Sequence, residues 1–301
     1  MGVTTARVGI IGGTGLGEWL AERVGGKRVD VETPYGPPST APVLARWDGV
    51  DVAFVSRHGP GHRYNPSTVP YRANIWAMKR LGVSSIIASG ATGSLREDIA
   101  PGELVLCDQV IDRTYRRANT FFDEGPVVHV ELADPVCPRL RAALRASAGA
   151  CDARVHDGGT YVCMEGPQFS TRAESLMHRQ WGGDLIGMTC MPEAKLAREA
   201  EICYAMIAFA TDYDCWRPGS TDRAPDALLK EITTNLHRAG ERAASLIRAA
   251  LGAVADADAS TACGCQTALK LAIWSDRSRI EPATRTRLEP LIERYLADNR
   301  E

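Results

Sequence analysis

The sequence predicts a single α/β domain with a central mixed sheet flanked by helices. Short apolar segments with the length of buried strands alternate along the chain with longer segments of helical periodicity. With 301 residues, of which 45% are hydrophobic, the chain can fill one sizeable core. No stretch rich in serine and glycine divides it, so we expect one domain.

The strand pattern begins at Val8, where four apolar or small residues lead into a run of glycines. Similar short runs bounded by turn residues recur along the chain. The predicted strands are residues 8–11, 50–55, 85–88, 104–107, 160–164, 184–188 and 202–211.

Three segments have the spacing and end signals of helices. Apolar residues recur at helical spacing over 71–81, after a proline and before a glycine. Thr171 and Glu174 have the form of a capping box, which predicts that a helix begins there. Residues 226–251 carry an apolar face over the longest helical stretch, and we expect this helix to pack over the sheet.

The last part of the chain differs in composition from the rest. Residues 253–261 are small and polar and interrupt the apolar pattern. We therefore expect a domain of residues 1–252 and a helical tail of residues 253–301 that packs on the same domain and on a neighbouring subunit.

Charge and composition exclude several classes of function. The chain has 35 Lys and Arg residues and 37 Asp and Glu residues, so its formal net charge is −2. Such a balance gives no general attraction to nucleic acid or to an anionic membrane, and we expect neither as a partner. The longest apolar stretch, 202–210, is too short for a bilayer span, and the strand pattern at Val8 leaves no room for a signal peptide. We expect a cytoplasmic protein, and its nine cysteines argue against a disulfide framework.

The glycine-rich run 12–15 follows the first strand and offers backbone N–H groups that can converge on an anion, with the hydroxyl of Thr14 as a further donor. A plain tight turn is the alternative. The dinucleotide-binding pattern G-x-G-x-x-G fails because residue 18 is Glu, and no P-loop motif is present, so a nucleotide cofactor is not expected.

Arg57 and His58 close another predicted strand. An arginine at a strand end supplies a planar fork suited to phosphate or carboxylate, although a surface arginine beside a packed histidine would look the same. His62 lies four residues after His58, but the glycines and proline between them oppose the helix that a zinc-binding pair would need. Residues 89–94 form a third small-residue loop after a strand, and ligands of open α/β sheets bind at such strand ends.

Asp212 and Asp214 end the most apolar predicted strand. In an extended segment their side chains share one face, which suits joint recognition of one polar edge of a ligand. Metal binding is a weaker alternative, because no histidine or further acidic residue clusters nearby, and turn-capping aspartates are the other one.

Taken in order, eight motifs of the chain resemble the trimeric purine nucleoside phosphorylase family, and within it the members that cleave methylthioadenosine. The likeness covers roughly residues 7–274. The motifs are Gly-Gly-Thr-Gly-Leu at 12–16, Ser-Arg-His-Gly at 56–59, Tyr-Arg-Ala-Asn-Ile-Trp-Ala at 71–77, Gly-Ser-Leu-Arg-Glu at 93–97, Asp-Gln-Val-Ile-Asp-Arg-Thr at 108–114, Glu-Gly-Pro-Gln-Phe-Ser-Thr-Arg-Ala-Glu-Ser at 165–175, Met-Thr-Cys-Met-Pro-Glu at 188–193 and Ala-Thr-Asp-Tyr-Asp-Cys-Trp at 210–216.

The resemblance implies a purine nucleoside phosphorylase-like fold and a pentosyl transfer in which inorganic phosphate attacks C1′ of a nucleoside and releases the purine with inversion. It implies no metal and no organic cofactor, phosphate being a co-substrate. An oxocarbenium-like sugar above a bound dianion agrees with the residue types. The positions that match the family's phosphate site are Thr14, Arg57, His58, Ala91 (through its backbone) and Thr189.

The resemblance also implies the nucleoside-binding residues. Asp212 and Asp214 match the catalytic, purine-reading pair of the members that act on 6-aminopurines, in which a protonated carboxyl can donate to N7. Members that prefer 6-oxopurines carry Asn at position 212 and Glu at position 170, so this chain is expected to prefer adenine. The remaining matched positions are Met188 against the ribose, His62 and His129 near the sugar and its 5′ substituent, and Phe169 and Ser170.

Two positions depart from the family pattern. Gly90 stands where a phosphate-binding Thr is usual, and Pro225 stands where a Val more often lines the 5′ pocket. Methylthio is the first choice of 5′ group, and other small apolar 5′ substituents, including a halogen, satisfy the same pattern. A 6-oxopurine nucleoside phosphorylase and a catalytically silent nucleoside-binding protein are the alternative functions.

The tail from Cys263 to Ile273 resembles the C-terminal helix of bacterial and archaeal relatives, which begins with C-x-C and reaches toward a neighbouring subunit's site. A homotrimer, or a hexamer formed by two trimers, is therefore expected. We expect Cys263 and Cys265 to form no obligatory disulfide in a reducing compartment, with a small redox staple as the alternative.

Overall fold

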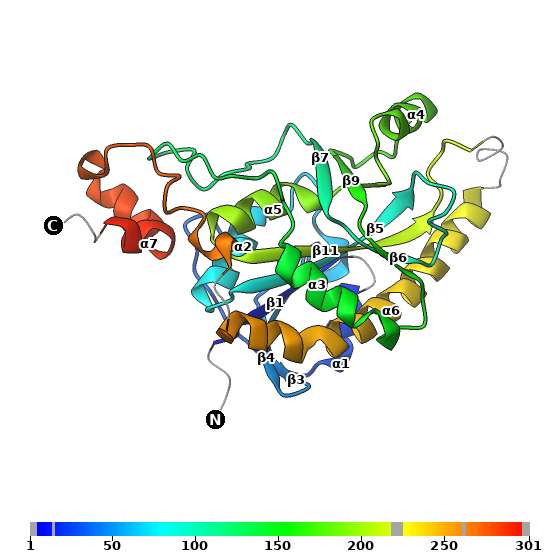
Figure 1. Ribbon diagram of the computed structural model, residues 1–301, viewed down its shortest axis with the longest axis horizontal. Coiled ribbons are helices and arrows are strands. Elements are labelled where there is room, and N and C mark those ends of the chain that lie inside the picture. Colours follow the sequence, from blue (N-terminus) through cyan, green and yellow to red (C-terminus); the bar gives the residue numbers. More distant parts are fainter. Residues whose placement is uncertain (1–4, 14–15, 218–224, 261–262, 297–301) are drawn as a thin grey trace.

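The computed structural model describes residues 5–13, 16–217, 225–260 and 263–296, and its strands form one mixed sheet (Figure 1). The strands are β1 (Val8–Gly12), β2 (Lys27–Arg28), β3 (Val43–Trp47), β4 (Val50–Ser56), β5 (Ser85–Ser94), β6 (Leu104–Leu106), β7 (Gln109–Arg113), β8 (Val155–Asp157), β9 (Thr160–Met164), β10 (Leu185–Gly187) and β11 (Cys203–Asp212). The α-helices are α1 (Leu16–Arg23), α2 (Tyr71–Arg80), α3 (Pro138–Ala146), α4 (Arg172–Gln180), α5 (Cys190–Glu199), α6 (Pro225–Ser260) and α7 (Pro282–Leu296).

The centre of the sheet is the parallel pair β5 and β11. Their register runs from Cys203 opposite Ser85 to Ala210 opposite Thr92. β1 pairs in parallel with β5 and with β4, and β10 pairs with the last residues of β5 in the antiparallel sense. β1, β4, β5 and β11 therefore end at one edge of the sheet.

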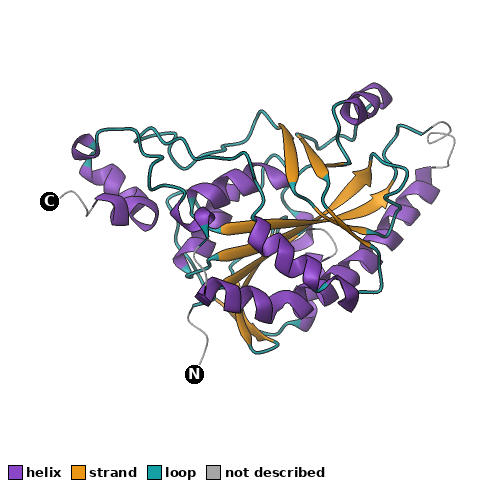
Figure 2. Ribbon diagram, in the orientation of Figure 1, coloured by secondary structure: helices purple, strands orange, loops and turns teal. Residues whose placement is uncertain are grey.

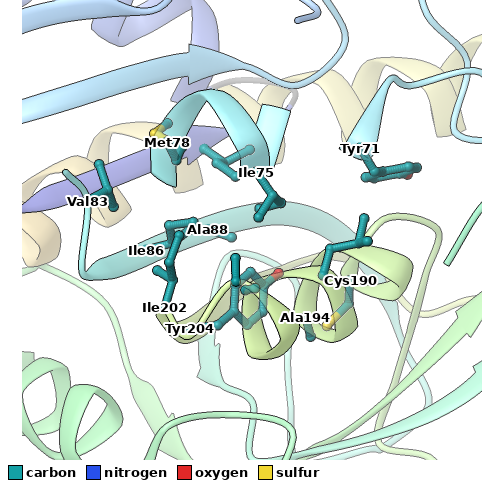
Figure 3. Close-up of a cluster of buried hydrophobic side chains, with 14 of the residues drawn as sticks. Tyr71, Ile75, Met78, Val83, Ile86, Ala88, Cys190, Ala194, Ile202 and Tyr204 are labelled. Carbon is teal, nitrogen blue, oxygen red and sulfur yellow. The ribbon is translucent and has the colours of Figure 1, made fainter. Parts of the chain in front are cut away.

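Helices cover both faces of this sheet (Figure 2). α2 and α5 pack together on one face, whereas α1 and α3 both pack against α6 on the other. Figure 3 shows the first of these layers, a buried cluster that includes Ile75 and Met78 of α2, Ala194 of α5 and Ile86 of β5. Burial on both faces explains why β11 is apolar along almost its whole length.

All seven predicted strands and all three predicted helices are present. The capping box is confirmed, because the Thr171 hydroxyl accepts from the Glu174 amide at 3.2 Å while a Glu174 carboxylate oxygen accepts from the Thr171 amide at 2.7 Å. The predicted lengths of one strand and one helix were wrong. Residues 89–94 are not a loop but the second half of β5, because they pair with β11, and α6 continues through the small polar segment to Ser260. That segment is rich in alanine, the residue with the highest helix propensity.

The tail after α6 packs back on the domain. Leu269, Ile273 and Leu288 join the cluster that α2 and α5 form with the sheet. Tyr295 of α7 donates a hydrogen bond to the buried carboxylate of Glu201 at 2.6 Å. None of the described helices has the length and apolar character that crossing a membrane requires.

Candidate active site

A cavity of about 520 Å³ lies at the edge of the sheet where the parallel strands end. This is the position at which open α/β sheets bind ligands. The cavity is lined by Gly13, Arg57, His58, His62, Arg63, Asn65, Pro66, Gly90, Ala91, Thr92, Gly93, Met164, Pro167, Phe169, Ser170, Ile186, Gly187, Met188, Thr189, Thr211, Asp212, Asp214 and Leu236.

Arg57 lies at one end of the cavity and is fully buried. Its Nε and Nη2 donate to the two carboxylate oxygens of Glu193, each at 2.8 Å, and its Nη1 donates to the Ser89 carbonyl at 2.7 Å. The Tyr204 hydroxyl donates to Glu193 as well, at 3.0 Å. These contacts hold the guanidinium plane in one orientation beside the cavity.

Small residues bring the backbone close to Arg57. A Cβ on Gly13 would lie 2.6 Å from the Ser89 carbonyl oxygen and 2.7 Å from Nη1 of Arg57, so only glycine permits this approach. Ala91 and Thr189 line the same cavity. Thr14 and the side chain of Pro225 lie outside what the structure describes.

His58 and His62 stack face to face, with ring centroids 4.1 Å apart and planes 10° apart. Nδ1 of His58 is 2.8 Å from the Tyr64 carbonyl oxygen, which can only accept, so the hydrogen is on Nδ1. Burial, reinforced by the charge of Arg57, lowers the pKa of His58 to about 4. The ring is therefore neutral near pH 7, and its Nε2 is a hydrogen-bond acceptor.

Asp212 and Asp214 line the cavity together, as their spacing suggested. The Thr211 hydroxyl donates to Asp212 Oδ1 at 2.7 Å. Oδ2 of Asp214 is buried and receives no hydrogen bond from the described residues. Burial raises the pKa of Asp214, and the neighbouring Ser175 and Ser170 hydroxyls oppose this only in part. The pair therefore combines a carboxyl that retains a proton more readily with one that is already hydrogen-bonded.

Met188, Phe169 and Ser170 line the cavity as well. The Phe169 ring is 79% exposed and lies at the opening. His62 lines the cavity as well and is exposed. The structure thus brings together every described residue that was expected at the site, with one exception.

The exception is His129, which does not line this cavity. Its amide donates to the Ala272 carbonyl at 2.9 Å, and its ring meets the edge of Trp274 at a centroid distance of 4.8 Å. The pairing of residue 128 with residue 273 of the tail holds this segment on another part of the surface, where His129 lines a second depression with Glu199. Within one chain, His129 does not reach the other site residues.

Two buried ion pairs were missed from the sequence. One is Arg57 with Glu193, and the other is Arg117 with Glu165, at 3.2 Å. Arg117 also donates to the Met188 carbonyl at 2.5 Å and to the Met191 carbonyl at 2.7 Å, and so positions the backbone that carries Met188. Glu165 and Glu193 were visible as parts of motifs, but a single sequence does not indicate which distant arginine each one meets.

Glu165 is ionised in this arrangement. Although burial opposes ionisation, hydrogen bonds from the Ser67 hydroxyl and from the amides of Tyr115 and Arg116 lower its pKa to about 2. The carboxylate therefore fixes Arg117 and the backbone of Tyr115 and Arg116 through charge-assisted hydrogen bonds.

The carboxylates and histidines of the cavity form no metal-binding group in the described part of the chain. The set that does bring three or more metal-binding side chains together there consists of cysteines, none of which lines the cavity.

The chain also matches a known protein family. The model of the family described as "Phosphorylase superfamily" matches residues 7–252, which is most of the chain. The chain belongs to the phosphorylase superfamily.

Several superfamily members resemble the chain over nearly their whole length. The S-methyl-5′-thioadenosine phosphorylase of Geobacter sulfurreducens is 50% identical over 290 residues, covering 96% of this chain and 99% of that protein. The protein of the same name from Cereibacter sphaeroides is 48% identical, covering 96% and 98%.

Solved structures of the superfamily show the same architecture. A methylthioadenosine phosphorylase from an Antarctic soil metagenomic library is 46% identical, with a TM-score of 0.86 over 96% of this chain and 99% of that one. The methylthioadenosine phosphorylase of Schistosoma mansoni, in complex with tubercidin, is 34% identical, with a TM-score of 0.76 over 84% and 93%. The fold class expected from the sequence is thereby confirmed.

Proposed function

We propose that this superfamily member is a pentosyltransferase that cleaves S-methyl-5′-thioadenosine with inorganic phosphate, giving adenine and 5-methylthioribose 1-phosphate. The observation that carries the proposal is one cavity lined both by a buried guanidinium, which contacts Ser89 of β5, and by a carboxyl pair that begins opposite Gly93 of the same strand. The names of the relatives support the same reaction.

Phosphate binds at the Arg57 end of the cavity. A guanidinium has five N–H groups. Within the described part of the chain, three of those of Arg57 donate to Glu193 and Ser89, which leaves two for a ligand. The Thr189 hydroxyl, the Ala91 backbone and Thr14 supply further donors. Nε2 of neutral His58 accepts a hydrogen bond from the hydroxyl of hydrogen phosphate.

Because Glu193 neutralises Arg57, this end of the cavity has no large excess of positive charge. Orientation of the phosphate by fixed donors therefore contributes more than bulk attraction. In the reaction, a phosphate oxygen forms a bond to C1′ while the C1′–N9 bond breaks and its electron pair stays with the purine.

The leaving purine is recognised by Asp212 and Asp214. Asp212 donates or shares the proton that N7 gains as N9 takes up the electron pair, and Asp214 helps to read the 6-amino edge. The raised pKa of Asp214 supports the presence of a proton within the pair. Ser170, next to the pair, can donate a hydrogen bond to the adenine N1, which carries no proton.

The ribose lies between the two ends, against Met188, with His62 toward the 5′ group. A small apolar substituent such as methylthio suits this position, because Phe169 and Met188 offer apolar surface there.

The protein is located in the cytoplasm. A homotrimer, or a hexamer of two trimers, completes the site. Support comes from large apolar side chains that one chain leaves largely exposed, namely those of Tyr115, Leu271 and Trp274. Trp274 contacts His129, so an interface there would bring that histidine toward a neighbouring cavity.

The proposal is tested by measuring purine released from methylthioadenosine, adenosine, methylthioinosine and inosine, each with and without phosphate. We expect release only with phosphate and the highest kcat/KM for methylthioadenosine. A preference for the 6-oxopurines would assign the chain to the other specificity class. Binding without release would make it a nucleoside-binding protein. Sedimentation velocity of the same preparation measures the subunit number.

A further inference from the structure

Four cysteine side chains come together outside the cavity. The Sγ atoms of Cys137, Cys203, Cys263 and Cys265 all lie within 4.8 Å of one another, and those of Cys137 and Cys263 are 3.6 Å apart. Only the C-x-C pair is visible as a motif, because the other two cysteines are far away in the sequence.

Each cysteine occupies a fixed place in the fold. Cys137 is the residue before α3, and Cys203 is the first residue of β11. Cys263 and Cys265 lie at the short 3-10 turn Gly264–Thr267 that follows α6. The amide of Cys137 donates to the Tyr204 carbonyl at 2.8 Å, and that of Cys203 to the Ser84 carbonyl at 2.9 Å. The backbone thus presents the four thiols from three separate segments.

We propose that these four cysteines form a structural Zn²⁺ site. In a tetrahedral tetrathiolate site with Zn–S bonds of about 2.3 Å, neighbouring sulfurs are roughly 3.8 Å apart, and the four Sγ atoms are already near that spacing. Four protein ligands leave no position for water, which makes the site structural rather than catalytic. This inference does not depend on the proposed function.

The donor set and its surroundings favour zinc. Thiolate ligands select soft or borderline ions over Mg²⁺ and Ca²⁺. On binding, the four thiols lose four protons, so the Zn²⁺ tetrathiolate carries a net charge of −2. Nη2 of Arg139 lies 3.3 Å from Cys203 Sγ and supplies compensating charge, while its Nη1 donates to the Ala257 carbonyl at 2.8 Å.

Burial of three of the cysteines protects such a site, and partial exposure of the fourth gives access to it. Cys137 and Cys203 are fully buried and Cys265 nearly so, whereas Cys263 is partly exposed and leaves a path for the ion. Bound zinc would join the start of the tail to the first residue of β11, the strand whose last residue is Asp212. The ion would hold the tail on the domain without contacting substrate.

The test is the metal content of the full-length wild-type protein, purified in a phosphine reductant after growth with zinc. Mass spectrometry of the eluted metal should give about one Zn²⁺ per chain. The Cys263→Ser variant should lose most of the zinc, and removal of zinc by a chelator should lower the Tm of the wild type. Cys151→Ser is the matched control, because Cys151 is buried outside the cluster and should not affect zinc content.

Cobalt substitution provides a readout that does not depend on a variant folding. Co²⁺ in four thiolates gives strong charge-transfer absorption and the ligand-field bands of a tetrahedral ion. A zinc-free wild-type protein that takes up neither Zn²⁺ nor Co²⁺ with its four thiols reduced would overturn the proposal. So would a protein freshly isolated without reductant whose intact mass shows the loss of two hydrogens per pair, since the cysteines would then be disulfides.

Discussion

The guanidinium of Arg57 and the carboxylate of Glu193 form a two-point ion pair from which water is almost fully excluded, with side-chain exposures of 0% and 1%. The same guanidinium borders the cavity in which phosphate is proposed to bind. Arg57 therefore neutralises a buried carboxylate and, in the proposed function, would also present its remaining N–H groups to phosphate. A simple truncation of Arg57 affects both.

We predict that Arg57→Met destabilises the protein by about 3–5 kcal/mol, because it leaves the Glu193 charge buried and unpaired. The double variant Arg57→Met/Glu193→Gln should recover much of that loss, since the amide oxygen of Gln can still accept from Tyr204. Urea unfolding measures both free energies. If the double variant is no more stable than the single one, the ion pair does not account for the loss.

The double variant also tests the binding role of Arg57. Even where its stability is restored to near that of the wild type, it should show a raised KM for phosphate and a much smaller change in KM for the nucleoside.

Asp212→Asn should lower kcat/KM for methylthioadenosine by about 10²- to 10⁴-fold, the usual contribution of a general acid. An amide can donate to N7 and to a 6-oxo group, so methylthioinosine should lose less. The measurement is kcat/KM for both substrates in both proteins. Equal losses on the two substrates would mean that this residue does not determine the choice of base.

Glu199 should contribute a loss of stability as the pH rises from about 4.5 toward 7, which opposes the gain that neutral His58 contributes up to about pH 6.5. Burial raises the pKa of this carboxyl to about 7, although the Phe121 amide and the Thr120 hydroxyl donate to it. In this pH range the folded chain keeps a proton that the unfolded chain releases, so raising the pH favours unfolding. A shift of this size is worth on the order of 3 kcal/mol.

Glu199→Gln should remove this contribution to the slope of stability against pH, so its stability relative to the wild type should rise with pH between about 4.5 and 7 and exceed that of the wild type at pH 8. Urea midpoints between pH 4.5 and 8 provide the comparison. Asp157, which is paired with arginines at the surface, offers a control variant, Asp157→Asn, that should leave this slope in place. An unchanged slope in Glu199→Gln would show that another group titrates.

Gly90→Ala should destabilise the protein by about 1–3 kcal/mol, the usual range for overpacking. The added Cβ would lie 2.9 Å from Cε of Met206 and 3.3 Å from Oγ1 of Thr189. Met206→Leu removes Cε, so the double variant should lose less stability than the two single losses combined. Thermal unfolding of all four proteins completes the cycle, and strict additivity would contradict the contact.

Much of the fold and the site followed from local sequence patterns. Strands and helices were predicted where apolar spacing and end signals coincide, as around Pro70 and Thr171. The residues at the strand ends could be grouped because parallel strands end at one edge of a sheet.

Other features depended on contacts between distant residues. Residues 89–94 look like a loop because they are small, and only the pairing of Gly90 with Ala208 reveals a strand. Nothing local connects Arg57 with Glu193, or the C-x-C pair with Cys137 and Cys203. For His129, its place beside Trp274 follows from how the tail returns to the domain.

The exposed ring of Phe169 has a thermodynamic consequence. A nucleoside that enters the cavity will cover an aromatic face that water now contacts, and removal of apolar surface from water lowers the heat capacity. The enthalpy of binding should therefore become more favourable as the temperature rises. Calorimetry at several temperatures would show this slope, and Phe169→Ser would make it shallower.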